Sequence, residues 1–533
     1  MSENGCPFGF CTLMMAAMEN LDTPCSQDAC YLALKARDAR FDGCFFTGVT
    51  STGIYCRPVC GVRTPKRENC RFFQLAAQAE QAGFRPCLRC RPELAPRQTA
   101  AGWSPGKPWS MQDASGILAT QAAALMDAPA TCGTQVLTVQ GLAQRLGISD
   151  RHLRRIFEVQ FGVSPLQYLQ TRRLLTAKQL LTDTTLAVNQ IAPMSGFASV
   201  RRFNAAFAQH YKLAPTQLRR QQTLKETEHI QVTLAYRPPY DAAAMLQFFA
   251  TRQISGMEMV APNHLQLGKT VALPHGSQRL TGWVLASFDE ARCRVDVQLS
   301  ESLASVLPLV INRVRALLDL DADPLAINQV LHAHFPQGDG LRVPGTPDGF
   351  ELAVRAVLGQ QISVVAARTL TRRLVARLGE PVHTPVPGLD RLFPTPEVLA
   401  VATGDTLGAL GIVKQRQAAI QALARAVASG QLCLDEGANV DATMAQLCAL
   451  PGIGDWTVQY IAMRALRWPD AFPAGDVALH KALGVQTSPN PSQAAQAASL
   501  AWKPWRSYAV TRAWATLPTP PQRVKVSATL SIS

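Results

Sequence analysis

Two closely spaced cysteine pairs constrain this chain most, because they predict a segment that folds around a metal ion. Cys56 and Cys60 are separated by three residues, Cys87 and Cys90 by two, and 26 residues lie between the pairs. Close pairs on two tight turns can converge on one tetrahedral ion, and four thiolates suit Zn²⁺. Spacing alone favours a purely structural site. Alternative ligands that lack paired spacing are Cys44 and Cys70.

The composition is that of a globular chain with several domains. With 533 residues it is too long for one hydrophobic core, and 47% hydrophobic against 17% charged residues excludes large-scale disorder. No run of about 18 apolar residues occurs, and the start, MSENGCPFGFCTLMM, lacks the basic region of a signal peptide. We therefore expect a cytoplasmic protein without a membrane partner, in which 14 cysteines indicate metal ligands or reactive thiols rather than disulfides.

The formal net charge of +14 is concentrated in two segments. Residues 56–91 hold 8 Lys/Arg against 2 acidic residues, and residues 145–220 hold 12 against 3. Such local basicity is expected where the phosphates of a nucleic acid are neutralised. A solvated basic face is the alternative for either segment.

Composition and periodicity divide the chain into four parts. PELAPRQTAAGWSPGKPWS is predicted to be a linker between the first and second parts. Residues 1–18 carry no pattern, and PTPPQRVKVSATLSIS is predicted to be a loose tail. Alternating segments such as QVTLAY and CRVDVQLS predict a small α/β or antiparallel unit in the third part, whereas the second and fourth parts have helical periodicity. The predicted domains are residues 19–95, 112–222, 229–318 and 319–517.

The residues around the cysteine pairs specify more than a metal. TGIYCRPVC, from Thr52 to Cys60, and GFRPCLRC, which ends at Cys90, resemble the metal-binding domain of Ada-type adaptive-response regulators over residues 25–95. The resemblance implies that Cys56 takes a methyl group from a methylphosphotriester in DNA. It also implies DNA-backbone contacts, for which loop capping and solvated arginines are the alternatives. The residues concerned are Thr52, Arg63 and Arg85.

The chemistry of such a transfer is reasonable on its own terms. Four thiolates on Zn²⁺ leave a net charge of about −2, so a coordinated sulfur stays deprotonated and nucleophilic at neutral pH. Methylation turns one thiolate into a neutral thioether and removes one negative charge that faces DNA. Affinity for the polyanion should then rise, which would make the cluster an irreversible electrostatic switch.

The second part contains two helix-turn-helix patterns. A helix from Thr138, a turn at Gly147 and an N-cap at Ser149 precede a helix in which Leu153, Ile156 and Phe157 form the buried stripe. The design recurs over residues 191–207. The arginines on the outer faces predict two adjacent major-groove readers, with packing without DNA binding as the alternative. The predicted DNA contacts are Arg151, Arg155, Arg201 and Arg202.

The phrases FGVSPLQY, from Phe161 to Tyr168, and GFAS, from Gly196 to Ser199, resemble the AraC-type DNA-binding domain over residues 112–220. RNA polymerase is therefore a further candidate partner. Pro193 departs from the pattern, because it falls inside the first helix of the second unit. It is expected to kink this helix, at a cost of about 3 kcal/mol if the helix does not bend.

The fourth part contains LPGIG from Leu450 to Gly454. Gly452 and Gly454 let the backbone approach a ligand, and the flanking apolar helices predict a helix-hairpin-helix whose amides hold a DNA phosphate, often with a monovalent cation. A simple Schellman turn is the alternative. Asp476 lies 20 residues beyond Trp456, at the position of the essential Asp of helix-hairpin-helix glycosylases, although an Asp after Gly is often only an N-cap.

Residues 229–517 resemble AlkA-type 3-methyladenine DNA glycosylases, through YRPPYD, VLGQQISV and WKPWRSY. The resemblance implies hydrolytic excision of 3-methyladenine and 7-methylguanine, with Asp476 stabilising the oxocarbenium ion. It also implies an aromatic pocket for the cationic base and Gln361 at the intercalating position. The pocket positions are Trp456, Tyr460 and Trp514, each of which could instead be core.

Three absences refine these expectations. Glycosylase-lyases carry Lys where this chain has Trp456, so a monofunctional enzyme is predicted. No four-cysteine run follows Cys448, so no iron–sulfur cluster is expected. The Pro-Cys-His-Arg motif of O6-alkylguanine methyltransferases does not occur, so repair of O6-methylguanine is not predicted.

Together the motifs predict a multidomain DNA-repair and regulatory protein that is nucleoid-associated and binds double-stranded DNA and one Zn²⁺. The predicted architecture is a small α+β zinc domain, an all-α AraC-type double helix-turn-helix, a small α/β domain of TBP-like type, and an all-α helix-hairpin-helix glycosylase domain. Two alternatives remain: a transcriptional regulator with a degenerate glycosylase half, and a glycosylase whose first two domains only hold DNA.

Overall fold

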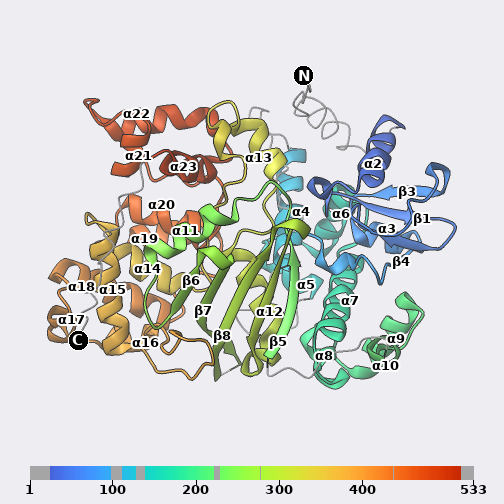
Figure 1. The fold of residues 1–533 in the computed structure, drawn as a ribbon, viewed down its shortest axis with the longest axis horizontal. Helices are drawn as coiled ribbons and strands as arrows, with labels where there is room; N and C mark the ends of the chain where they lie inside the picture. The colour runs from blue at the N-terminus through green and yellow to red at the C-terminus, as the bar shows by residue number, and fades with distance from the viewer. Residues whose placement is uncertain are drawn as a thin grey trace, which may run out of the picture.

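The computed structural model describes residues 24–97, 111–127, 138–220, 229–276, 278–435 and 437–517. The patternless start, most of the predicted linker, the polar stretch before residue 229 and the predicted tail lie outside these residues. Figure 1 shows the cysteine-rich and helix-turn-helix parts on one side, the large sheet in the middle and the C-terminal helices on the other side. None of the described helices is both long and apolar enough to cross a membrane.

The cysteine-rich part is an α+β unit around a four-stranded sheet of order β3-β1-β2-β4. β1 pairs antiparallel with β2 and β3, whereas β2 and β4 run parallel. Because β2 and β4 are parallel neighbours, Cys56 at the end of β2 and Cys87 just after β4 reach the same edge of the sheet. The elements are α2 (Pro24–Ala36), β1 (Phe46–Val49), β2 (Ile54–Cys56), β3 (Cys70–Phe73), α3 (Ala76–Gln81) and β4 (Arg85–Pro86), with short 3₁₀ turns η1 (Ala39–Phe41), η2 (Arg67–Asn69) and η3 (Pro92–Leu94).

The second part contains the two predicted helix-turn-helix units, joined by the long helix α7. Leu153, Ile156 and Phe157 are buried as expected, and Ser149 caps the second helix by accepting a hydrogen bond from the His152 amide. The helices are α4 (Met111–Asp127), α5 (Val139–Arg145), α6 (Asp150–Phe161), α7 (Pro165–Asp183), α8 (Val188–Met194), α9 (Val200–Tyr211) and α10 (Pro215–Arg220).

Pro193 disturbs the second unit less than its sequence position predicts. Helix α8 continues through Pro193 to Met194, and the proline is exposed in the last turn of this short helix. The next helix, α9, keeps its cap, because Ser199 accepts a hydrogen bond from the Arg202 amide. The second unit thus has the same form as the first.

The third part is a five-stranded sheet of order β5-β9-β8-β7-β6, and every pairing in it is antiparallel. Of the two predicted arrangements, the antiparallel one is therefore found. Buried and less buried residues alternate along β9, so one face of the sheet lies in the core. The elements are β5 (His229–Ala235), α11 (Ala242–Arg252), β6 (Glu258–Ala261), β7 (Gln266–His275), β8 (Gln278–Asp289) and β9 (Arg294–Ser300), with short 3₁₀ turns between them.

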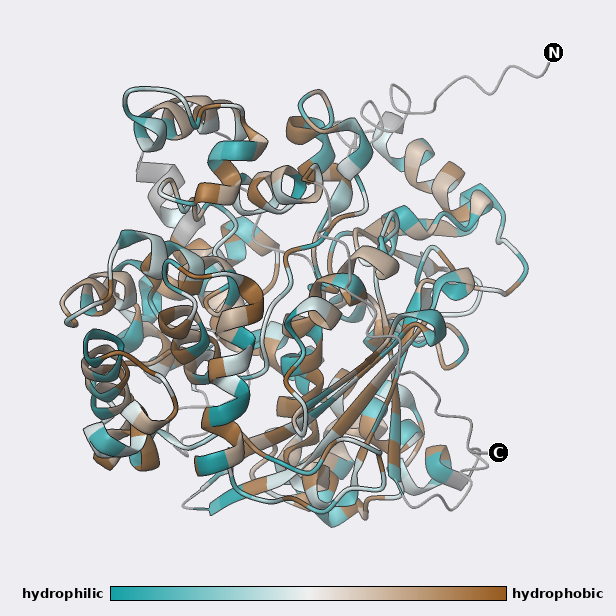
Figure 2. Ribbon diagram, turned by 60° about the vertical axis from the view of Figure 1, so that its left-hand side comes forward, coloured by the Kyte–Doolittle hydropathy of each residue, from teal (hydrophilic) through white to brown (hydrophobic). Residues whose placement is uncertain are grey.

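The fourth part is helical. Helix α14 is buried almost all round at its centre. Figure 2 shows hydrophobic residues along the strands of the large sheet and on parts of many helices. The helices are α12 (Leu307–Leu317), α13 (Pro324–Leu331), α14 (Gly349–Leu358), α15 (Val364–Leu378), α16 (Pro396–Val401), α17 (Gly404–Ala409), α18 (Lys414–Ala428), α19 (Val440–Cys448), α20 (Asp455–Arg464), α21 (Val477–Ala482), α22 (Pro491–Ala498) and α23 (Arg506–Ala515).

A buried charge network joins the sheet to α14. Lys269 contacts Glu258 at 2.7 Å and Glu351 at 2.8 Å, and Arg355 contacts the same two carboxylates. Burial alone would raise the pKa of Glu258, but Arg355 and Lys269 lower it to about 2. The network therefore holds its charges at neutral pH and fixes the sheet on the helical part.

Several residues of the two basic segments do not face solvent but form ion pairs between the first two parts. Lys178 of α7 is fully buried and contacts Glu93 at 2.5 Å, and its ammonium also donates to the Cys87 carbonyl. Arg91 reaches Asp183 at 2.6 Å. The charges of these two residues are therefore neutralised within the protein, neither by solvent nor by phosphates.

The start of the predicted linker is also held rather than free. Arg237, only 1% exposed, donates hydrogen bonds to the carbonyls of Asp42, Pro96 and Arg97 on one side and of Asp321 and Ala322 on the other. Five backbone acceptors around one buried guanidinium join the cysteine-rich part to the second half of the chain.

Candidate functional sites

The four predicted ligands meet in one cluster. The Sγ atoms of Cys56, Cys60, Cys87 and Cys90 all lie within 4.8 Å of one another. Sulfurs around a tetrahedral Zn²⁺ are about 3.8 Å apart, given Zn–S bonds of about 2.3 Å. The donor set and its spacing therefore fit zinc.

The alternative ligands lie outside this cluster. Cys70 Sγ donates to the Lys66 carbonyl at 3.3 Å. Burial raises the pKa of Cys44 to about 12, so this thiol stays protonated at neutral pH.

Backbone hydrogen bonds distinguish Cys56 from Cys87 and Cys90. Cys87 Sγ accepts from the Arg89 and Cys90 amides at 3.4 and 3.5 Å, and Cys90 Sγ accepts from the Arg57 amide at 3.3 Å. Among the described residues no backbone amide donates to Cys56 Sγ. Since hydrogen bonds withdraw charge from a thiolate, Cys56 keeps more of its nucleophilicity than Cys87 and Cys90.

The predicted DNA-backbone contacts of this part lie near the cluster. Thr52 and Arg63 are exposed, and Arg85 on β4 is half-buried. The Thr52 hydroxyl donates to the Val49 carbonyl at 3.3 Å, so it also closes the turn between β1 and β2. Capping and a DNA contact are compatible for Thr52.

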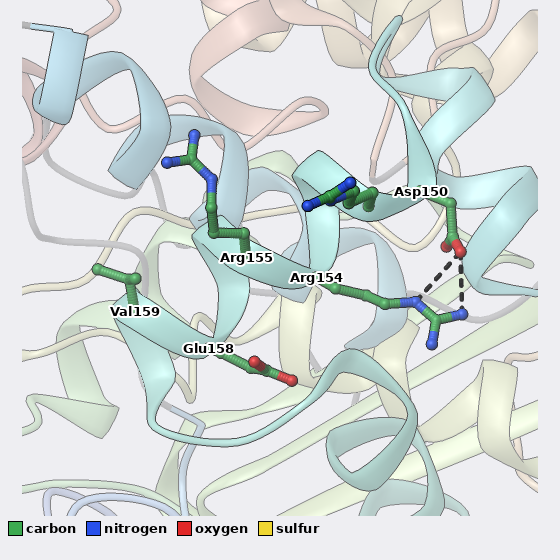
Figure 3. A pocket seen from close by; sticks show the side chains of 6 residues that line it. Asp150, Arg154, Arg155, Glu158 and Val159 are labelled. Atoms are coloured by element: carbon green, nitrogen blue, oxygen red, sulfur yellow. Dashed lines mark hydrogen bonds and ion pairs between the residues drawn. The ribbon is translucent and has the colours of Figure 1, made fainter.

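The predicted reading helices present their arginines to solvent. Arg151, Arg154 and Arg155 are exposed on α6, along a shallow, open depression that this helix lines. Figure 3 shows Arg154 turned back to Asp150, which it contacts at 2.9 Å, while Arg155 projects away. On α9, Arg201 and Arg202 are exposed in the same way.

The hairpin has the predicted glycine geometry. Gly452 has a φ of +74°, and a Cβ there would lie 3.0 Å from the Ala419 Cβ. Gly454 is the N-cap of α20, with open space where its side chain would be. The Ile453 amide donates to the Leu450 carbonyl within the turn, whereas Gly454 and Asp455 at the exposed start of α20 are accessible to a phosphate.

Gln361 lies in the turn between α14 and α15, where it is exposed and has a φ of +55°. Its neighbour Gln360 connects this turn to the hairpin, donating to the Gly452 carbonyl at 2.9 Å and to the Thr457 hydroxyl at 3.0 Å. The turn and the hairpin are therefore held at a fixed separation.

Asp476 is held by two indoles. Trp456 Nε1 donates to its Oδ2 at 2.9 Å, and Trp514 Nε1 donates to its Oδ1 at 3.1 Å. The Leu479 amide also donates to Oδ1, so Asp476 is the N-cap of α21 as well. The capping role that the sequence leaves as the alternative is therefore present, and a catalytic role of the same carboxylate stays a prediction.

The three predicted aromatic residues form one group beside Asp476. The rings of Trp456 and Tyr460 stack at 5.2 Å with an interplanar angle of 16°, and Trp514 lies 6.4 Å from Tyr460. Burial raises the pKa of Tyr460, but Arg464 and Arg252 outweigh this and lower it, and Arg464 donates to the phenol oxygen.

The structure adds Phe248 of α11 to this region. The Arg464 guanidinium lies over both the Phe248 and the Tyr460 rings, at 4.8 and 5.2 Å, and Arg252 lies 3.8 Å from the Phe248 ring centre. Sequence reasoning missed Phe248, because an aromatic in an apolar helix gives no signal of a site more than 200 residues away.

Four family models match the chain, in the order of its parts. They are the metal binding domain of Ada at residues 29–93, a helix-turn-helix domain at 142–221, the AlkA N-terminal domain at 231–348, and the HhH-GPD superfamily base excision DNA repair protein at 354–507. The predicted multidomain architecture and the zinc cofactor are thereby confirmed, with the four-cysteine cluster as the zinc site.

Relatives match either nearly the whole chain or one part of it. A probable bifunctional transcriptional activator/DNA repair enzyme AlkA of Mycobacterium tuberculosis is 36% identical over 506 residues, which cover 92% of this chain and 97% of the relative. DNA-3-methyladenine glycosylase 2 of Escherichia coli is 36% identical over 53% of this chain and 96% of its own length. The bifunctional transcriptional activator/DNA repair enzyme Ada of Escherichia coli is 33% identical over 28% of this chain and 36% of its own length. The chain therefore belongs to the family of bifunctional transcriptional activator/DNA repair enzymes that join an Ada-type regulator to an AlkA-type DNA glycosylase.

Proposed function

We propose that the glycosylase half hydrolyses the N-glycosidic bond of alkylated purines, above all 3-methyladenine and 7-methylguanine. The observation that carries this proposal is the carboxylate of Asp476, held by the indole N–H groups of Trp456 and Trp514. These rings and Tyr460 form an aromatic surface that attracts a cationic flipped base. The name of the Escherichia coli relative supports the choice of substrate.

Catalysis follows from this placement. N-alkylation makes the base cationic and weakens its bond to the sugar, so the leaving group departs neutral. Charge then develops on the sugar as an oxocarbenium ion, and the Asp476 carboxylate stabilises it and orients a water molecule. Gln361 fills the gap left by the flipped base. The hairpin amides at Gly452 and Gly454 hold a DNA phosphate, and a monovalent cation would bind at the same hairpin.

The proposed enzyme is monofunctional. No Lys occupies the position of Trp456, so no amine is available there for a Schiff base with the sugar. We expect wild-type protein to release 3-methyladenine and to leave abasic strands that break only after treatment with alkali. Strand cleavage without alkali, together with borohydride trapping of a protein–DNA adduct, would contradict this expectation.

We further propose that Cys56 accepts the methyl group of a methylphosphotriester. Zn²⁺ held by the four cysteines would keep the Cys56 sulfur deprotonated, and this sulfur accepts no backbone hydrogen bond among the described residues, so its negative charge is less withdrawn than that of Cys87 or Cys90. Thr52, Arg63 and Arg85 would position the phosphate. The loss of one negative charge would then strengthen DNA binding.

Methyl transfer has a direct signature. After exposure to duplex DNA with methylphosphotriesters, we expect Cys56 to gain about 14 Da, one methylene unit, in intact-mass and peptide analysis. Cys56→Ser should gain nothing, whereas Cys70→Ser, which changes a thiol outside the cluster, should react like wild type. Modification at a residue other than Cys56 would contradict the assignment.

For the regulatory part, we propose that α6 and α9 read two adjacent major-groove segments through Arg151, Arg155, Arg201 and Arg202, and that RNA polymerase is the partner of the bound activator.

The proposed domain boundaries remain 19–95, 112–222, 229–318 and 319–517, and nucleoid association would follow from DNA binding. A regulator with a degenerate glycosylase half is the alternative, and the intact hairpin and Asp476 argue against it.

A further inference from the structure

A small cavity lies beside the sulfur of Cys56. Its volume is about 20 Å³, roughly the space of one water molecule or one methyl group. Its inner wall is buried and includes Leu34, Thr47 and Cys60, whereas Val62 and Thr64 of the outer wall are partly exposed. The cavity therefore runs from the surface toward the sulfur.

Thr47 is the unusual residue of the inner wall. It pairs directly with Cys56 across the antiparallel strands β1 and β2, so both side chains point to the same face of the sheet. Thr47 is fully buried, and its hydroxyl oxygen has no hydrogen-bond partner among the described residues. An unpartnered buried hydroxyl destabilises a fold, so packing within the protein does not explain this side chain.

The outer wall lies where a phosphate would bind. Arg63, between the wall residues Val62 and Thr64, is exposed. Cys56 is only 6% exposed. The alkyl carbon of a phosphotriester held at Arg63 can therefore reach the Cys56 sulfur only if the alkyl group enters the cavity. The phosphate oxygen then lies outside the cavity, the alkyl carbon lies inside it, and the sulfur lies at its inner end.

We propose that this cavity is the alkyl-receiving pocket of the methyl acceptor and that Thr47 sets the largest alkyl group that can be transferred. The proposal rests on the proposed methyl transfer to Cys56. In the step, an S–C bond forms and the C–O bond breaks, and its electron pair leaves with the phosphate oxygen as a phosphodiester anion. The thiolate becomes a thioether and no proton moves. A methyl group fits the cavity, whereas an ethyl group exceeds it by one methylene.

The test uses the zinc-loaded full chain and duplexes with a single methyl- or ethylphosphotriester. By intact mass, wild type should gain the methyl group at least about ten times faster than the ethyl group, as expected for one excess methylene in a closed pocket. Thr47→Ala and Thr47→Ser, which enlarge the cavity, should raise the ethyl-to-methyl rate ratio about tenfold. Thr47→Ile, which fills it, should slow methyl transfer.

Thr47→Val is the matched control, because it keeps the shape and removes only the hydroxyl. It should leave the rate ratio unchanged and raise the melting temperature of the zinc-loaded protein, since an unpartnered polar group is lost. Zinc content shows that each variant is folded around its metal.

The outcomes separate the two proposals. If wild type gains no methyl group, methyl transfer itself fails. If wild type gains the methyl group but its ethyl-to-methyl ratio is the same in Thr47→Ala, Thr47→Ser and Thr47→Ile, the pocket proposal is overturned while the acceptor stands. Equal rates of methyl and ethyl transfer to wild type would overturn the pocket proposal too. A lower melting temperature of Thr47→Val would show that the hydroxyl has a partner, against the proposal.

Discussion

Asp476→Asn is expected to abolish the release of 3-methyladenine from methylated DNA and to leave DNA binding intact. The amide cannot stabilise an oxocarbenium ion by charge, and losing such an electrostatic contribution costs on the order of 10³ in rate, about 4 kcal/mol. The amide nitrogen would also face an indole N–H of Trp456 or Trp514, which both donate to the carboxylate in wild type. Both effects act on the chemical step.

The measurement is chromatographic release of the free base, with binding to an abasic-site duplex measured in parallel. Because Asp476 also caps α21, a melting temperature is needed to show that the variant is folded. Asp455→Asn is the matched control, since it removes an exposed carboxylate from the first turn of α20, next to the hairpin. Turnover of Asp476→Asn within tenfold of wild type would place catalysis at a different residue.

Lys178→Met is expected to destabilise the chain by about 3 kcal/mol, because it leaves the Glu93 carboxylate buried without its ammonium partner. The side chain of Glu93 is 1% exposed and that of Lys178 is fully buried. Arg91 still contacts Glu93 at 3.0 Å, which keeps the loss at the lower end of the usual range. The expected decrease is in the free energy of unfolding measured in urea.

Two variants make this prediction specific. Lys178→Met combined with Glu93→Gln should recover most of the lost stability, since no buried charge is then left alone. Lys66→Met, which breaks a pair whose side chains are 81% and 72% exposed, should have no measurable effect. If Lys66→Met and Lys178→Met cost the same, the buried pair does not hold the first two parts together.

The sequence predicted the sites whose chemistry needs residues close together along the chain. Cys56 and Cys60 lie on one turn, and Gly452 and Gly454 in one hairpin, so their spacing alone predicts the local geometry. Asp476 and Trp456 belong to neighbouring elements, and their contact was implied by family resemblance. The structure brings these residues together as expected, and their proposed roles remain predictions.

Contacts between distant segments could not be predicted. Lys178 contributes to a basic stretch in the sequence, but Glu93 neutralises it in the structure from 85 residues away. Thr47 shows nothing unusual until the register of β1 and β2 places it opposite Cys56. Pro193 is predicted to kink the first helix of the second unit, yet this helix ends one residue later, so the missing donor falls in an exposed last turn. For Lys178 and Thr47 the contact depends on tertiary packing, and for Pro193 the outcome depends on where the helix ends, neither of which the local sequence specifies.

The hydrogen bonds of Arg237 limit how far the chain can be treated as interchangeable modules. Its guanidinium satisfies carbonyls of Asp42, Pro96 and Arg97 as well as carbonyls of the glycosylase half. A graft of either half onto a foreign partner would leave a buried cation or several buried acceptors without a counterpart. The contact surfaces of the two halves therefore match each other, and exchanging one half requires redesigning the contact surface of the other.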